Sequence, residues 1–125
     1  MIDHISVGVA DLDRAARFYE AVLASLGLSR LVTRPRTIGF GRSYPEFWIN
    51  LRPGMAKVAP ESGVHICLRA KAAAEVDAFH AAALTAGGAS DGAPGIRPHD
   101  RVKYYAAFVI DPDGNRIEAV TFPSE

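Results

Sequence analysis

The sequence predicts an α+β fold made of two copies of one module, each with the order strand, helix, strand, strand, strand. The main observation behind this prediction is an internal repeat, in which the run HISVGV at residues 4–9 returns as HICLRA at residues 65–70. At the same offset of 61 positions Phe18 aligns with Phe79. Matches that recur at one fixed offset are typical of a duplicated structural unit.

The chain length and the place of the repeat set the expected domain organisation. A chain of 125 residues matches one domain of ordinary size, and the offset of the repeat is about half of that length. We therefore expect a single domain over residues 1–125, with the first module at about 1–55 and the second at about 61–125. Residues 53–60, which contain two prolines and a glycine, are the expected linker.

Each copy is expected to open with a strand and continue into a helix. The opening strands are the apolar runs at residues 2–9 and 64–70. Asp11 is a plausible N-cap of the first helix and Gly27 its expected end. Apolar residues recur at helical spacing in both helices: Leu12, Ala15, Ala16, Tyr19, Val22, Leu23 and Leu26 in the first, and Val76, Phe79 and Ala83 in the second.

The rest of each module is expected to form strands. The strand-like segments are residues 31–34, 37–41 and 47–52 in the first module, and 104–110 and 116–122 in the second. Residues 111–115, with the sequence DPDGN, have the composition of a tight turn between the last two strands. The corresponding early strand of the second module has no clear pattern, and we expect a loop at residues 92–100, which contain Pro94, Gly95 and Pro98.

Composition excludes several classes of function. The chain has 14 Lys and Arg against 14 Asp and Glu, so it lacks the positive charge of a nucleic-acid binder and any charge run for a membrane surface. The single cysteine, Cys67, rules out an internal disulfide and a multi-cysteine zinc site. No apolar stretch approaches the ~20 residues of a membrane-spanning helix, and no signal-peptide pattern opens the chain. We expect a cytoplasmic protein without nucleic-acid or membrane partners.

Three polar residues stand out on apolar strands. The repeat makes His4 and His65 equivalent, so pairing of the modules would bring their imidazoles near each other. Glu118 lies in an otherwise apolar strand, where a buried carboxylate is costly unless it is paired or bound to a metal. Two histidines and one carboxylate form a common ligand set for divalent metals. The alternative is that the histidines are structural or exposed and that Glu118 faces solvent.

The sequence resembles the vicinal oxygen chelate superfamily, which includes glyoxalase I, extradiol dioxygenases, fosfomycin-resistance thiol transferases and bleomycin-resistance proteins. The resemblance covers essentially the whole chain, and its most specific segment is FVIDPDGNRIE at residues 108–118; the other matching segments are residues 4–12, 18–19 and 63–66. It implies two paired βαβββ modules that form a cupped, eight-stranded mixed sheet with the helices outside. It also implies a divalent metal at the centre of the cup.

The resemblance places the metal ligands on His4, His65 and Glu118, and the fourth position, at the end of the first module, on Asn50. Asn50 offers a neutral oxygen and cannot accept a proton near pH 7, which leaves Glu118 as the expected catalytic carboxylate. Iron, manganese, nickel, cobalt and zinc all suit such a site. The resemblance therefore implies a metal-dependent enzyme acting on a small substrate with vicinal oxygens. An isomerase, lyase or transferase is favoured over a dioxygenase.

Strand alternation suggests which residues surround the metal. If Asn50 faces the site, then Trp48 and Arg52 share its face, and we assign all three to substrate binding. Trp48 can stack on a planar substrate and Arg52 can hold an anionic one. One of the two adjacent tyrosines, Tyr104 and Tyr105, must also face inward, and we assign Tyr105 to substrate binding. The alternatives are a packed tyrosine, a core Trp48, an exposed Arg52 and a Cys67 that only fills space.

A second function stays open. Bleomycin-resistance relatives sequester a planar drug without metal chemistry, and in that case the aromatic residues matter more than the histidines. The resemblance also implies a homodimer, because two-module relatives often dimerise and sometimes share sites between subunits.

Overall fold

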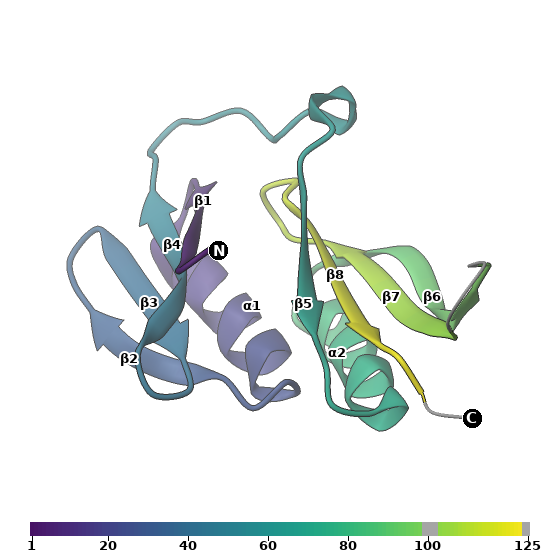
Figure 1. Cartoon of the computed structure of the whole chain (residues 1–125). Coiled ribbons are helices and arrows are strands. Elements are labelled where there is room, and N and C mark those ends of the chain that lie inside the picture. Colours follow the sequence, from purple (N-terminus) through teal and green to yellow (C-terminus); the bar gives the residue numbers. More distant parts are fainter. Residues whose placement is uncertain (99–102, 124–125) are drawn as a thin grey trace.

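A computed structural model describes residues 1–98 and 103–123 (Figure 1). The first module contains β1 (Ile5–Val9), α1 (Leu12–Ala24), β2 (Ser29–Thr33), β3 (Thr37–Gly41) and β4 (Pro45–Leu51). A linker with the short 3₁₀ helix η1 (Pro60–Ser62) leads to the second module, which contains β5 (His65–Arg69), α2 (Ala73–Thr85), β6 (Ala89–Arg97), β7 (Tyr104–Ile110) and β8 (Arg116–Thr121). The predicted pair of βαβββ modules is confirmed.

The two modules repeat each other in topology as well as in sequence. The first sheet has the strand order β1-β4-β3-β2 and the second the order β5-β8-β7-β6. In each sheet the opening strand runs parallel to the last strand, and the other pairs are antiparallel. Hydrogen bonds join the eight strands into two four-stranded sheets, with β1 and β5 at the edges that lie next to each other (Figure 1).

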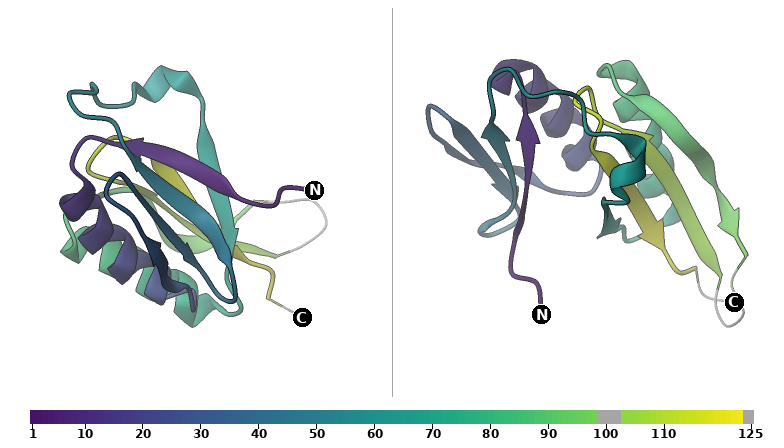
Figure 2. Two further views of the ribbon diagram at one scale, coloured as in Figure 1. Left: turned by 90° about the vertical axis from the view of Figure 1, so that its left-hand side faces the viewer. Right: turned by 90° about the horizontal axis from the view of Figure 1, so that it is seen from above.

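The helices begin and end where the sequence predicts. The Asp11 carboxylate accepts a hydrogen bond from the backbone N–H of Arg14 and caps α1. Gly27 takes a positive φ of 81° just after α1, a conformation that glycine adopts without strain. In α2 the three residues of the predicted apolar stripe, Val76, Phe79 and Ala83, are the buried ones. Both helices lie on the same side of the strands and contact each other (Figure 2).

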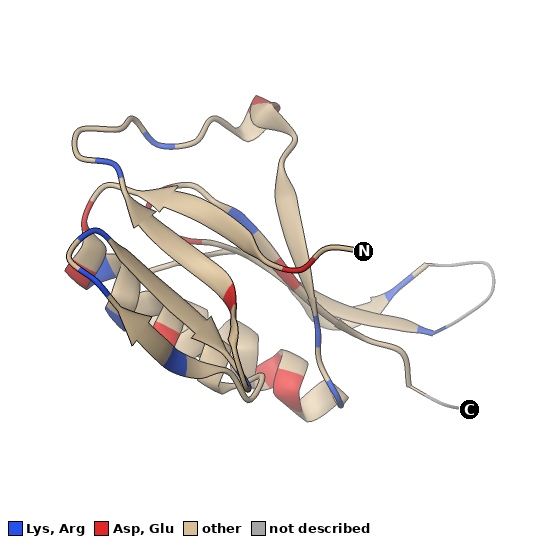
Figure 3. Ribbon diagram, turned by 60° about the vertical axis from the view of Figure 1, so that its left-hand side comes forward, with Lys and Arg blue, Asp and Glu red and all other residues tan. Residues whose placement is uncertain are grey.

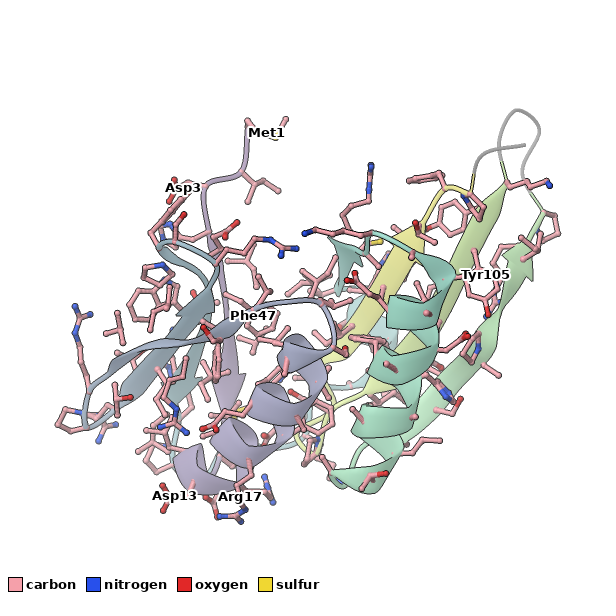
Figure 4. All side chains as sticks on the ribbon, turned by 90° about the horizontal axis from the view of Figure 1, so that it is seen from below. Met1, Asp3, Asp13, Arg17, Phe47 and Tyr105 are labelled. Atoms are coloured by element: carbon pink, nitrogen blue, oxygen red, sulfur yellow. The ribbon has the colours of Figure 1, made fainter. Side chains whose placement is uncertain are left out.

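One hydrophobic core serves both modules. Phe18 and Tyr19 of α1 are fully buried, and Tyr19 packs its ring 4.9 Å from that of Phe47 on β4, behind α1 in Figure 4. Phe79 of α2 belongs to the same cluster, as does Val109 of β7. A shared core of this kind makes the two modules a single folding unit.

The expected loop at residues 92–100 is wrong for most of its length. β6 extends from Ala89 to Arg97 and pairs with β7 through two register shifts, around Gly92 and Gly95. Prolines and glycines occur in strands at such irregular edge positions. Because the same residues are also typical of loops, the sequence pattern did not indicate a strand here. The last two residues of the expected loop, 99–100, lie outside the described residues.

The predicted turn at residues 111–115 does more than connect two strands. Asp111 closes the turn by accepting hydrogen bonds from the backbone N–H groups of Asp113 and Asn115, and its other oxygen accepts the Tyr19 hydroxyl at 2.5 Å. Burial raises the pKa of Asp111, while these hydrogen bonds oppose that shift. We call Asp111, Asp113 and Asn115 the module clasp.

The module clasp fastens the second module to the first. Asp113 Oδ1 accepts hydrogen bonds from the Ala10 backbone N–H at 3.0 Å and from the Arg14 guanidinium at 2.8 Å. The Asn115 side chain donates to the Gly8 carbonyl at 3.0 Å. Because these contacts hold β1 and the start of α1 against the β7–β8 turn, the relative orientation of the two sheets is fixed within one chain.

Candidate metal and substrate site

The face of the second sheet away from α2 brings four polar side chains together. The strand register pairs Cys67 with Glu118, so both side chains point to this face. His65 lies two residues before Cys67 on β5, and its side chain therefore points to the same face. His65 Nε2 lies 3.1 Å from Glu118 Oε1, and the Tyr104 hydroxyl donates to Glu118 Oε2. We call His65, Cys67, Tyr104 and Glu118 the module 2 half-site.

Its geometry suits a metal ligand pair. Glu118 is only 2% exposed, whereas the His65 side chain is 52% exposed. Donor atoms that each lie about 2.1 Å from one ion are separated by roughly 3.0–3.4 Å at ordinary ligand angles. The 3.1 Å between His65 Nε2 and Glu118 Oε1 falls in this range. The pair therefore fits two adjacent positions of one divalent cation, with the open side toward solvent.

The neighbouring hydroxyl and thiol are held neutral. Partial burial and then the nearby Glu118 charge raise the pKa of Cys67 to about 12, so the sulfur is a thiol at pH 7. Desolvation and the hydrogen bond to Glu118 raise the pKa of Tyr104 as well. A neutral thiol is a poor nucleophile, and a protonated tyrosine is a hydrogen-bond donor, so Tyr104 is the better candidate for a chemical role.

His4 is oriented by two residues that the sequence analysis missed. Its Nδ1 lies 2.7 Å from Asp3 Oδ2, and the Tyr44 hydroxyl donates to the other Asp3 oxygen at 3.2 Å. These two hydrogen bonds, from His4 first, lower the pKa of Asp3, which keeps the carboxylate charged. A carboxylate beside Nδ1 favours the tautomer in which Nε2 carries the free lone pair, as is common for metal-binding histidines. No sequence pattern marked Asp3 or Tyr44.

The register shows which residue of the first module is equivalent to Glu118. Ser6 pairs with Trp48 on β4 in the same way that Cys67 pairs with Glu118 on β8. Trp48 is therefore the module 1 equivalent of Glu118, and Asn50 lies two residues further along β4, opposite Gly8. Asn50 is nevertheless on the same face, where its amide oxygen accepts a 2.5 Å hydrogen bond from Thr37.

The other residues assigned to substrate binding are placed differently from one another. Trp48 lies on the predicted face, and the Arg34 guanidinium lies over its ring, 5.5 Å from the ring centroid. Arg52 instead bonds its own neighbouring carbonyl, that of Leu51. Arg34, which the sequence analysis did not single out, is thus the cation at this aromatic ring.

Tyr105 is not part of the candidate site. It pairs with Thr121 on the helix side of the sheet, and its hydroxyl donates to Asp77 of α2 at 2.5 Å (Figure 4). Because side chains alternate along a strand, its neighbour Tyr104 takes the inward position. The structure thus places Tyr105, expected to bind substrate, on the side of α2, and Tyr104 beside Glu118.

The two halves of the expected metal site remain separate in one chain. A groove of about 350 Å³ lies between β1 and β5, and His4 and His65 both line it. Within residues 1–98 and 103–123, no three His, Cys, Asp or Glu side chains are grouped closely enough to hold a metal ion. One chain therefore brings His65 and Glu118 together but does not add His4 to them.

Comparison with known proteins fits this architecture. A profile of the Glyoxalase/Bleomycin resistance protein/Dioxygenase superfamily matches residues 1–119. The chain belongs to this superfamily. A glyoxalase/bleomycin resistance protein from Albidiferax ferrireducens is similar in structure, with a TM-score of 0.83 and 32% sequence identity; the match covers 94% of this chain and 96% of that one.

More distant superfamily structures share the fold. A glyoxalase I variant from Zea mays has a TM-score of 0.73 at 19% identity, covering 94% of this chain and 45% of that one. A fosfomycin resistance protein from Listeria monocytogenes has a TM-score of 0.68 at 16% identity, covering 96% and 91%. A search of curated proteins finds no match. Within the described residues, no helix is long and apolar enough to cross a membrane.

Proposed function

We propose that this superfamily member is a divalent-metal-dependent enzyme whose ligands are His4, His65 and Glu118. The observation that carries the proposal is the module 2 half-site, where a buried carboxylate and an exposed imidazole lie 3.1 Å apart. The Asp3 contact that leaves His4 Nε2 free supports it. A divalent ion held there would polarise two neighbouring oxygens of a small substrate as a Lewis acid.

Protein groups around the ligands provide the remaining chemistry. The Tyr104 hydroxyl, whose pKa is raised, donates a hydrogen bond to a substrate oxygen or keeps Glu118 in place. Glu118 is the carboxylate in position to accept a proton from a substrate carbon. Asn50 and Trp48 of the first module bind the rest of the substrate. This arrangement suits an isomerase, lyase or transferase acting on vicinal oxygens.

We further propose that a second copy of the chain supplies His4. The module clasp and the shared core fix the two sheets, so His4 cannot swing toward Glu118 by a hinge between modules. In the part of the chain that the structure describes, the outer edges of β1 and β5 have no strand partner. Exposed apolar side chains flank both strands, with Ile2 77% and Val64 63% exposed. Unpaired apolar edges of this kind favour association with another copy.

Calorimetric titration with Mn²⁺ and with Zn²⁺ tests the metal site. Wild type is expected to bind about one ion per chain. Glu118→Gln is expected to weaken binding at least about 100-fold, because it removes an anionic ligand but keeps the size of the side chain. Glu61→Gln, an exposed change on η1, is the matched control and should bind as wild type does. Equal binding by all three proteins would contradict the assignment of Glu118.

The second candidate function is metal-free binding of a planar molecule. The aromatic face of Trp48 beside Arg34 favours it. Thermal unfolding with and without metal separates the two functions, since a ligand that binds only the folded state raises its stability by mass action. Unfolding temperatures that do not respond to any divalent metal would favour the metal-free function.

A further inference from the structure

A shallow pocket on the first sheet has a lining without any acidic side chain. Its volume is about 220 Å³, and it lies on the face of β1, β3 and β4 away from α1. The lining residues are His4, Ser6, Arg34, Thr37, Trp48 and Asn50. Their side chains are an imidazole, two hydroxyl groups, an amide, an indole ring and a guanidinium. The pocket therefore disfavours cationic ligands and offers donors to an anion.

The Trp48 ring is part of the lining of this pocket. A Cβ at Gly39 would lie 2.9 and 3.0 Å from two carbons of the six-membered ring of Trp48, and 2.8 Å from Pro45 Cβ. The six-membered ring of Trp48 therefore lies against Gly39, in space that a side chain at residue 39 would occupy. Trp48 also lines the pocket, so its indole offers apolar aromatic surface against which a flat ligand can pack.

Arg34 supplies an unbalanced positive charge beside that ring. Its guanidinium lies 5.5 Å from the Trp48 centroid, and within residues 1–98 and 103–123 it has no carboxylate partner. The chain as a whole has no net charge, and its positive and negative residues are interspersed (Figure 3). The Arg34 guanidinium beside the Trp48 ring is thus a local positive charge. It suits a planar group that carries a carboxylate or a similar anion.

We propose that this pocket binds a small planar anion, with its ring stacked on Trp48 and its anionic group bonded to Arg34. This inference rests on the proposed function, because it names a substrate class for the site to which His4 belongs. A substrate of this class would be an unsaturated or aromatic carboxylate, or an anion of similar shape. Ser6 and Asn50 also line the pocket, and they add hydrogen bonds to the bound anion.

Trp48 is the only tryptophan in the chain, so its fluorescence reports on the pocket directly. We would titrate metal-free protein with three probes: benzoate, its neutral analogue benzamide, and the non-planar anion cyclohexanecarboxylate. Benzoate is expected to bind about five- to tenfold more tightly than either of the others, since only benzoate both stacks and carries charge. Equal affinities for all three probes would overturn the proposal.

Two arginine variants assign the charge. Arg34→Gln should make benzoate and benzamide bind equally, while Arg36→Gln, which is near in sequence but outside the pocket lining, should keep the preference for benzoate. An unchanged preference in Arg34→Gln would overturn the role of Arg34.

The titration also separates this inference from the proposed metal chemistry. A benzoate preference in a protein that fails to bind any divalent metal would support the pocket and refute the metal site. Metal binding without a benzoate preference would refute the pocket alone.

Discussion

Replacing Asp113 with alanine is expected to lower the free energy of unfolding by about 2–4 kcal/mol. The change removes the acceptor for the Ala10 backbone N–H and for the Arg14 guanidinium. Asp113 is only 3% exposed, so the groups it leaves behind lose a buried partner, although Arg14, with 43% of its side chain exposed, regains some contact with water. The other Asp113 oxygen is buried without a hydrogen-bond partner among the described residues, which keeps the loss below the upper limit for such pairs.

Urea unfolding measures this effect, and Asp13→Ala is the matched control. Asp13 lies in the first turn of the same helix as Arg14 and faces solvent, as Figure 4 shows. Its loss should cost less than about 1 kcal/mol, the usual value of a charge near a helix N-terminus. If Asp113→Ala were no more destabilising than Asp13→Ala, the module clasp would not hold the two modules together.

Mixing two variants that cannot bind metal on their own is expected to restore metal binding. His4→Ala and Glu118→Ala should each bind no metal as separate proteins, because every site lacks one ligand. In a mixed dimer, however, the intact His4 of one chain meets the intact His65 and Glu118 of the other. Random exchange of subunits makes about half of the dimers mixed, and each has one complete site of two, so metal content should return to about a quarter of wild type.

The same mixture distinguishes a shared site from one built within a single chain. Subunits are exchanged by joint unfolding and refolding, and bound metal is measured after dialysis. Wild type taken alone through the same unfolding and refolding controls for losses on refolding. If the mixture of the two variants stays free of metal while refolded wild type regains it, His4 and Glu118 act within one chain and the shared site is refuted.

Local patterns along the chain were enough to predict most of the fold. The repeated run around His4 and His65 located both opening strands, and the DPDGN turn located the last hairpin, because each of these signals lies within a few residues of the element it specifies. β6 was missed because its prolines and glycines lie at irregular edge positions that sequence patterns do not distinguish from a loop.

The candidate site was predictable only where it repeats or alternates along a strand. His65 and Glu118 meet as expected. The sequence did not indicate that Trp48, two residues before Asn50, is the register equivalent of Glu118, because this follows only from the pairing of Ser6 with Trp48. Arg34 comes from a neighbouring strand end and reaches Trp48 through tertiary packing. Contacts of this kind depend on strand register and side-chain conformation, which a single sequence does not specify.

We propose that His65 and Glu118 hold a divalent metal together with His4. The most direct test is elemental analysis of freshly purified wild type and His65→Ala, each also reconstituted with Mn²⁺, Fe²⁺, Co²⁺, Ni²⁺ and Zn²⁺ and dialysed. We expect close to one ion per chain in wild type for at least one of these metals, and a loss of nearly all of it in His65→Ala. Wild-type protein that retains no metal after reconstitution, or a His65→Ala variant that retains as much as wild type, would contradict it.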